Sequence, residues 1–68
     1  MESVGEALPK EMARIRDVVI PAYETCGPAS AIAIAFMKQD LDAAARAMAE
    51  GDTIAMLQAL VTLRDVKL

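Results

Sequence analysis

Histidine is missing from this sequence, and cysteine occurs once, at Cys26. One cysteine cannot form a disulfide within the chain, and without histidine or further cysteines the chain offers no ligand set for zinc. The sequence also lacks a cysteine–histidine pair and a glycine-rich loop that could hold phosphate groups. Because few groups remain for proton transfer or nucleophilic attack, we expect a non-catalytic protein without metal or cofactor.

A basic cluster is missing as well, because 7 lysine and arginine residues stand against 10 aspartate and glutamate residues, for a net charge of −3. Proteins that bind duplex nucleic acid carry a basic face that displaces counterions from the phosphates, so we expect no such partner. The longest apolar run, residues 29–37, is far shorter than the ~20 residues that span a bilayer. An unpaired cysteine is typical of a reducing compartment, and we expect a cytoplasmic protein without a membrane partner.

Aromatic residues are scarce, since Tyr23 and Phe36 are the only two, whereas 56% of the 68 residues are hydrophobic. Most of these are alanine, leucine, isoleucine, valine and methionine, which suit helices. A chain of this length buries only about 60% of the surface that it exposes when unfolded, so its core needs reinforcement. With disulfides and zinc excluded, we expect an all-α fold that forms a homo-oligomer.

The N-terminal part predicts a flexible tail over residues 1–7 and a single helical domain over residues 8–68, because the tail has no periodicity. Ordered structure is expected to begin near Pro9, since proline suits the first helical position. An apolar stripe then recurs every three or four positions, at Leu8, Met12, Ile15, Val19 and Ala22. Pro21 removes a backbone donor, and it predicts either a kink or the end of this first helix.

The middle of the chain predicts a second helix from Pro28 or Ala29 to Glu50, because glycine and proline at positions 27 and 28 separate it from the first. Gly51 is its expected C-terminal stop. Charges of alternating sign mark its solvent face, at Lys38, Asp42, Arg46 and Glu50. After a short turn, Asp52 is the expected N-cap of a third helix over residues 53–66, antiparallel to the second.

The third helix has an apolar arc too wide for one partner helix, and the start of the second helix is apolar or small on all sides. These two features predict an oligomer interface. Its expected residues are Ile32, Phe36, Met56, Leu57, Leu60 and Leu63. The predicted architecture is an oligomeric bundle of two to three helices per chain, in which an antiparallel hairpin packs with a kinked N-terminal helix.

Cys26 begins the sequence Cys-Gly-Pro, three quarters of the motif that opens a helix in thioredoxin-like redox proteins. The resolving cysteine of such a motif would stand at position 29, where this chain has alanine. We therefore expect no redox role and interpret Cys26 as a small buried residue at a helix joint.

The start of the second helix also allows an anion site, because helix N-termini present free backbone donors. The candidate residues for a nucleotide or phosphate are Arg14, Arg16, Tyr23, Thr25, Ser30 and Lys38. The alternative is ordinary helix capping, which needs the same hydroxyl groups.

Three segments, IPAYETCGPASAIA, QDLDAAARAMAEGD and AMLQAL, together resemble small helical proteins encoded by bacteriophages and prophages. The second segment is also similar to one helix-turn-helix unit of tetratricopeptide-type repeats, but the chain is too short for an array. The phage resemblance covers most of residues 9–66 and contains no functional motif. It implies an accessory protein of the host cytoplasm that binds and inhibits a host protein. The alternatives are an oligomer that sequesters a small anionic ligand, such as a nucleotide signal of host defence, and a purely structural assembly factor.

Overall fold

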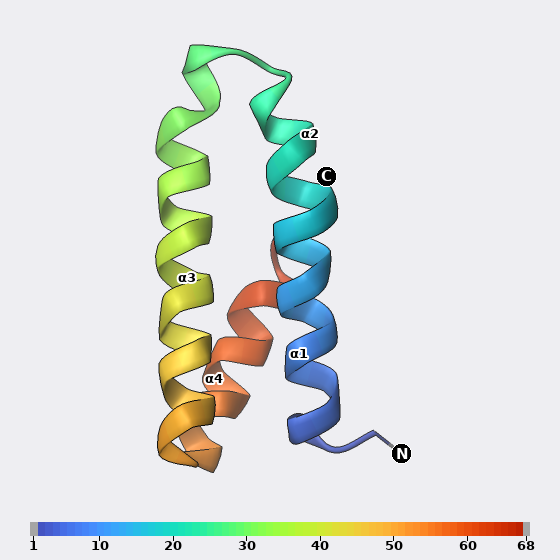
Figure 1. The fold of residues 1–68 in the computed structure, drawn as a ribbon, viewed down its shortest axis with the longest axis vertical. Helices are drawn as coiled ribbons and strands as arrows, with labels where there is room; N and C mark the ends of the chain where they lie inside the picture. The colour runs from blue at the N-terminus through green and yellow to red at the C-terminus, as the bar shows by residue number, and fades with distance from the viewer. Residues whose placement is uncertain (1, 68) are drawn as a thin grey trace.

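The computed structural model describes residues 2–67, and these form three helical rods without a strand (Figure 1). The first rod consists of α1 (Val4–Arg14), the π-helical segment η1 (Ile15–Val19) and α2 (Ile20–Glu24). The second begins with the 3₁₀ turn η2 (Pro28–Ser30) and continues as α3 (Ala31–Glu50); the third is α4 (Thr53–Arg64). The all-α fold with a helical hairpin is therefore confirmed.

The first rod and α3 run antiparallel along the whole molecule, whereas α4 occupies only one half of its length (Figure 1). α4 packs against both α3 and α1. The long axis of the molecule measures 36 Å. One half of the molecule therefore contains three packed helices and the other half contains two.

The first helix begins at Val4, five residues before the expected start at Pro9. Ala7 donates a backbone hydrogen bond of 2.8 Å to Ser3, and Ala7 and Leu8 are both buried. The expectation of a flexible tail was therefore wrong for residues 4–7, and Met1 lies outside the described residues. Pro9 lies inside the helix and leaves one backbone carbonyl without its hydrogen bond. The burial of Ala7 and Leu8 offsets this loss of stability.

Pro21 neither ends the first rod nor interrupts its helical backbone. Just before it, the backbone N–H of Ile20 bonds to the carbonyl of Ile15, five residues earlier, so the helix widens to a π turn. A π turn changes the hydrogen-bond register at the point where proline lacks a donor. The rod then continues to Glu24, so the first helix does not end at Pro21.

The turn between α3 and α4 has the predicted local structure. Gly51 adopts a left-handed conformation, φ 68° and ψ 24°, and its N–H bonds to Met48. The carboxylate of Asp52 accepts a hydrogen bond of 3.1 Å from the backbone N–H of Ala55, as an N-cap residue should. The helix that follows ends at Arg64, two residues earlier than expected.

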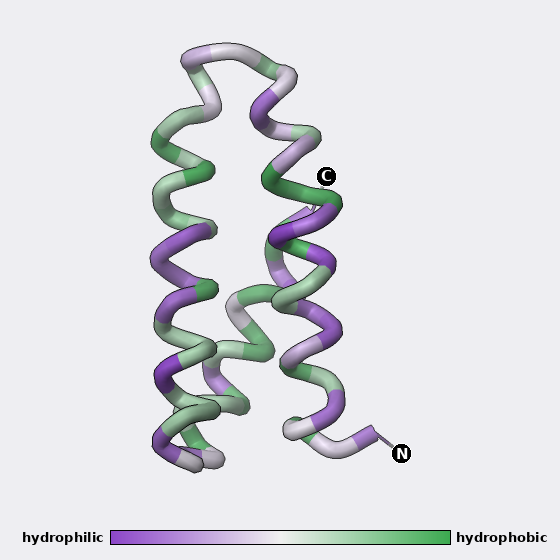
Figure 2. The backbone as a smooth tube through the Cα atoms, viewed as in Figure 1, coloured by the Kyte–Doolittle hydropathy of each residue, from purple (hydrophilic) through white to green (hydrophobic). Residues whose placement is uncertain are grey.

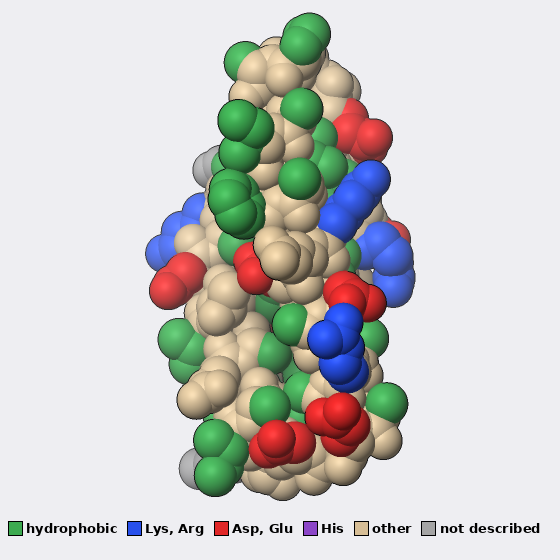
Figure 3. All heavy atoms as spheres, turned by 90° about the vertical axis from the view of Figure 1, so that its left-hand side faces the viewer, with side chains coloured by type: hydrophobic (Ala, Val, Ile, Leu, Met, Phe, Trp, Pro, Cys, Tyr) green, Lys and Arg blue, Asp and Glu red, His purple; other side chains and the backbone are tan. Residues whose placement is uncertain are grey.

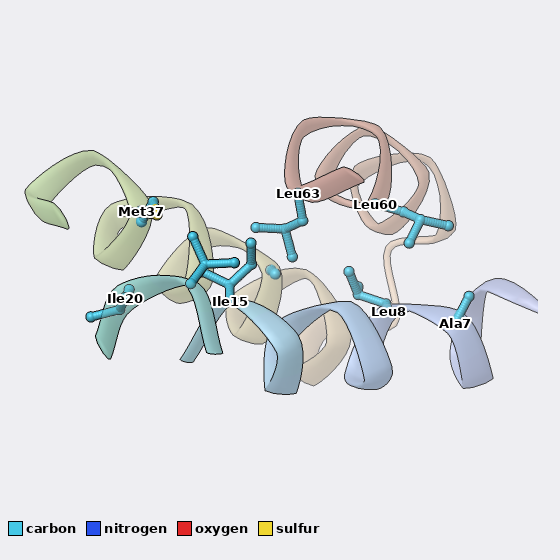
Figure 4. Packing of buried hydrophobic residues seen from close by; sticks show 9 residues of the cluster. Ala7, Leu8, Ile15, Ile20, Met37, Leu60 and Leu63 are labelled. Carbon is cyan, nitrogen blue, oxygen red and sulfur yellow. The ribbon is translucent and has the colours of Figure 1, made fainter. Parts of the chain in front are cut away.

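The core lies between the first rod, α3 and α4, and its largest fully buried side chains are Leu8, Ile15, Val19 and Leu63. Figure 4 shows Leu8 and Ile15 on the first rod, facing the helix that carries Leu60 and Leu63. Met37 and Ala44 join this cluster from α3. Burial of each large aliphatic side chain contributes roughly 1.5–3 kcal/mol, so this small cluster determines how the three rods pack.

Candidate protein-docking face

One side of α3 faces α4 along its lower half, and this side has small residues. Ala43 and Asp40 line a groove together with residues of α4, and Ala47 is buried. These positions lie three or four residues apart, so they share one face of the helix. Small side chains here allow α4 to approach α3 closely.

The same side of α3 carries large apolar residues in its other half. Continuing the spacing of four from Asp40 leads to Phe36 and Ile32, whose side chains are 61% and 71% exposed. α4 has 12 residues against 20 in α3, or roughly 18 Å against 30 Å, and does not reach them. We call this uncovered part of α3 the recess.

The figures show the same change along α3. In Figure 2 its upper half is mostly hydrophobic, and the hydrophilic residues begin near the middle of the helix. In Figure 3, which faces α3, hydrophobic side chains gather over this upper half and charged ones become frequent farther down. The recess therefore lies on an apolar, uncharged part of the surface.

A groove forms the lower end of the recess, where the chain leaves α4. It has a volume of about 460 Å³ and is lined by Tyr23, Ala33, Phe36, Met37, Asp40 and residues 65–67. The hydroxyl of Tyr23 donates a hydrogen bond of 3.2 Å to the carbonyl of Lys67, which holds the segment after α4 against α2. Phe36 and Met37 provide apolar walls, and three charged residues line the same groove, the half-buried Asp40 and the exposed Asp65 and Lys67.

α4 has an exposed apolar strip of its own. Ile54, Leu57 and Val61 are 70%, 48% and 62% exposed, and their spacing of three and four places them on one side of the helix. Residues 53–63 carry no charge on any side, and neither do residues 25–37. We call this set the exposed apolar face: Ile32, Phe36, Ile54, Leu57 and Val61.

The expected interface residues fall into two groups in the structure. Ile32, Phe36 and Leu57 are exposed, whereas Leu60 and Leu63 are buried and Met56 packs against the core. Leu60 and Leu63 are therefore not exposed as interface residues, because α1 packs against that side of α4, and Met56 is half-buried. Ile54 and Val61 belong to the wide apolar arc that predicted an interface, but they were not among its expected residues, although their spacing from Leu57 indicates a second apolar stripe.

The arginines of the expected anion site serve other contacts. Arg14 bonds to backbone carbonyls at the end of α4 and pairs with Glu11 at 3.1 Å. Arg16 pairs with Asp17 at 3.0 Å on the surface, and this hydrogen bond lowers the pKa of the Asp17 carboxyl. Lys38 is exposed on α3. The basic groups are thus distributed over different elements.

The hydroxyls of the expected anion site are also engaged by the chain itself. Ser30 Oγ lies 2.7 Å from the carbonyl oxygen of Tyr23 and 2.8 Å from that of Gly27, and its proton can serve either acceptor. Thr25 donates to Ala22 at 2.7 Å. These bonds close the joint between α2 and α3, so Ser30 and Tyr23 are brought together, but Arg14 is not.

Cys26 is exposed, which corrects the expectation of a buried residue. The joint lies at one end of the molecule (Figure 1), where the chain is packed on one side only. The Cys26 thiol lies 3.6 Å from the carbonyl oxygen of Ala22, as a weak donor. It follows that no packing in the core depends on this side chain.

Within residues 2–67, no cluster of three or more histidine, cysteine, aspartate or glutamate side chains could hold a metal ion. No helix in this described part has the length and hydrophobicity needed to cross a membrane. Comparisons with models of known families, with curated proteins and with solved structures found no match.

Proposed function

We propose that the protein is a non-catalytic helical binding module and that it binds another protein through the exposed apolar face. One observation carries this proposal: the side of α3 that has alanines beneath α4 has isoleucine and phenylalanine where no helix covers it. Large exposed apolar patches mark interaction surfaces, and aromatic residues are enriched at the centres of interfaces. A helix laid along the recess would bury Phe36 and Ile32, as Ala47 is buried in the other half of α3.

The biological role that fits such a module is the one implied by the phage resemblance, the binding and inhibition of a host protein. A bound helix needs an apolar side to match Ile32 and Phe36, and it meets charged groups only at the lower end of the recess, where Asp40, Asp65 and Lys67 line the groove. In helix-in-groove recognition the bound helix inserts apolar anchors three to four residues apart, and Ile32 and Phe36 would form the apolar surface that receives them.

The experiment compares the wild type with Phe36→Asp and with Val18→Asp as a matched control. Val18 is an exposed apolar residue of the first rod, outside the exposed apolar face. Each protein is immobilised, proteins are captured from a candidate host lysate, and any captured protein is purified and titrated by calorimetry. We expect direct binding by the wild type and Val18→Asp and loss of binding by Phe36→Asp. Equal binding by all three proteins would reject the face.

Sequestration of a small anionic ligand is the alternative function, and it has less support. The hydroxyls of Thr25 and Ser30 already donate to backbone carbonyls, and Arg14 is bound to the end of α4. Calorimetry against a panel of nucleotides distinguishes the two functions. Submillimolar binding that is lost in Lys38→Ala would support the ligand site instead.

A further inference from the structure

We infer that α4 of a second copy of this chain occupies the recess, in a two-fold symmetric dimer that joins the copies through their exposed apolar faces. This inference rests on the proposed function, because it uses the same exposed apolar face; a host protein would bind there in competition with the second copy. The two copies run antiparallel, so that each recess receives the α4 of the other copy.

The shape of the chain favours this arrangement. α4 is roughly 18 Å long, about half of the 36 Å long axis, and it stands on one half of the α3 side that faces it. The other half is the recess, whose surface lies deeper than that of α4 because no helix covers it. A copy turned by a two-fold axis across the middle of this surface places its own projecting helix where the first copy has its recess. The surface made of the projecting α4 and the recess beside it is therefore complementary to itself, as a symmetric interface requires.

The lengths and directions of the two apolar parts also match. Residues 54–61, which hold the strip of α4, extend for roughly 10 Å, and the first eight residues of α3, which hold Ile32 and Phe36, extend for roughly 12 Å. By helical spacing, Ile54 and Val61 lie on the side of α4 turned away from the buried Leu63. One symmetry operation thus covers two surfaces that are otherwise left in water.

The absence of charged side chains from the two apolar segments favours a second copy over a charged partner. Each chain has a net charge of −3, so two copies repel each other at long range. The contact surfaces avoid this cost, because residues 25–37 and 53–63 contain no charged side chain. Asp40, Asp65 and Lys67 line the groove between the two apolar parts; Asp65 and Lys67 are exposed to water, which screens them, and Asp40 is half-buried.

The apolar area is sufficient for a stable dimer. The five side chains of the exposed apolar face provide roughly 60–100 Å² each, or roughly 300–500 Å² per copy. A standard interface buries about 800 Å² per partner, of which somewhat more than half is apolar. The exposed apolar face therefore supplies about the apolar share of one ordinary interface.

The test is sedimentation equilibrium at micromolar concentrations, with circular dichroism to confirm that each variant remains helical. Phe36→Asp alters the recess, Val61→Asp alters the strip of α4, and Val18→Asp is the control. We expect the wild type and the control to sediment at twice the mass of the 7.2 kDa chain. Each of the other two variants should raise the dissociation constant at least roughly 30-fold, the effect of losing a central anchor. If either variant loses helicity, the corresponding serine substitution replaces it.

A mixture of Phe36→Asp and Val61→Asp tests the pairing itself. In the mixed dimer both substitutions fall on one of the two symmetric contacts, and the other contact is intact. The mixture should therefore associate more tightly than either variant alone. A mixture no tighter than its components, or equal weakening by Val18→Asp, would overturn the inference.

The wild type gives the last outcome. A folded wild-type monomer overturns the dimer, yet the proposed function survives if a purified partner still binds it in a manner that depends on Phe36. A dimer that meets every expectation above but binds no other protein supports the inference and rejects the proposed binding of a host protein.

Discussion

The side chain of Arg14 donates a hydrogen bond of 3.0 Å from Nη2 to the carbonyl oxygen of Leu63, in the last turn of α4. The same nitrogen donates to the carbonyl of Val66 at 2.8 Å. The final carbonyls of a helix have no partners within it, and a positive charge is favourable at this end of the helix dipole. Arg14 therefore joins α1 to the end of α4 beside the core residue Leu63.

The first prediction is that Arg14→Met lowers the free energy of unfolding by about 2 kcal/mol, because hydrogen bonds to charged groups contribute more than neutral ones. Methionine keeps much of the apolar stem and removes the donors. Urea unfolding followed by circular dichroism measures the change. Arg16→Met is the matched control and should have little effect, since its pair with Asp17 lies on the surface. Equal losses in the two variants would show that the bonds of Arg14 do not stabilise the fold.

A second prediction separates the two apolar sides of α4. Leu63→Ala should lower the free energy of unfolding by about 3 kcal/mol, because Leu63 is fully buried and its removal leaves a cavity. Leu57→Ala, the same change on the exposed side, should cost less than about 1 kcal/mol in dilute protein, where copies do not associate. Urea titrations of both variants give the comparison. A large loss for Leu57→Ala in the dilute monomer would mean that the exposed side is part of the core.

The helices themselves could be predicted because their signals are local. Gly51 and Asp52 end one helix and cap the next with interactions confined to a few residues, and both were predicted. The start at Val4 was missed, because Pro9 and the absence of periodicity argue against a helix there. The burial of Ala7 depends on contacts with distant parts of the chain, and no local pattern shows them.

The candidate site was predictable only in part. The sequence shows that α4 is apolar on nearly all sides, and this wide arc indicated a second contact surface. It does not show which stripe faces α1, because Leu60 and Val61 are equally apolar neighbours. The role of Arg14 could not be predicted either, since its acceptor on Leu63 is 49 residues away.

A third prediction concerns Cys26. Cys26→Ser should change the free energy of unfolding by less than about 0.5 kcal/mol and leave binding intact, because the side chain is exposed and outside the apolar face. In the wild type, a maleimide reagent should label the thiol fully without denaturant. Mass spectrometry before and after unfolding measures the labelled fraction. Labelling that requires denaturant would contradict the exposed position.

The last prediction compares the same substitution at the two glycines that have positive φ. Gly51 has φ 68° and ψ 24°, a left-handed conformation that asparagine also adopts, so Gly51→Asn should cost less than about 1 kcal/mol. Gly27 has φ 88° and ψ −168°, a region essentially restricted to glycine, and Gly27→Asn should cost about 1–3 kcal/mol. Beyond the glycine and its two chain neighbours, no atom lies within 4 Å of where a Cβ would stand at either position, so the difference must come from backbone conformation and not from collision. Urea unfolding of the two variants measures it, and a smaller loss at Gly27 than at Gly51 would contradict the conformation of the joint between α2 and α3.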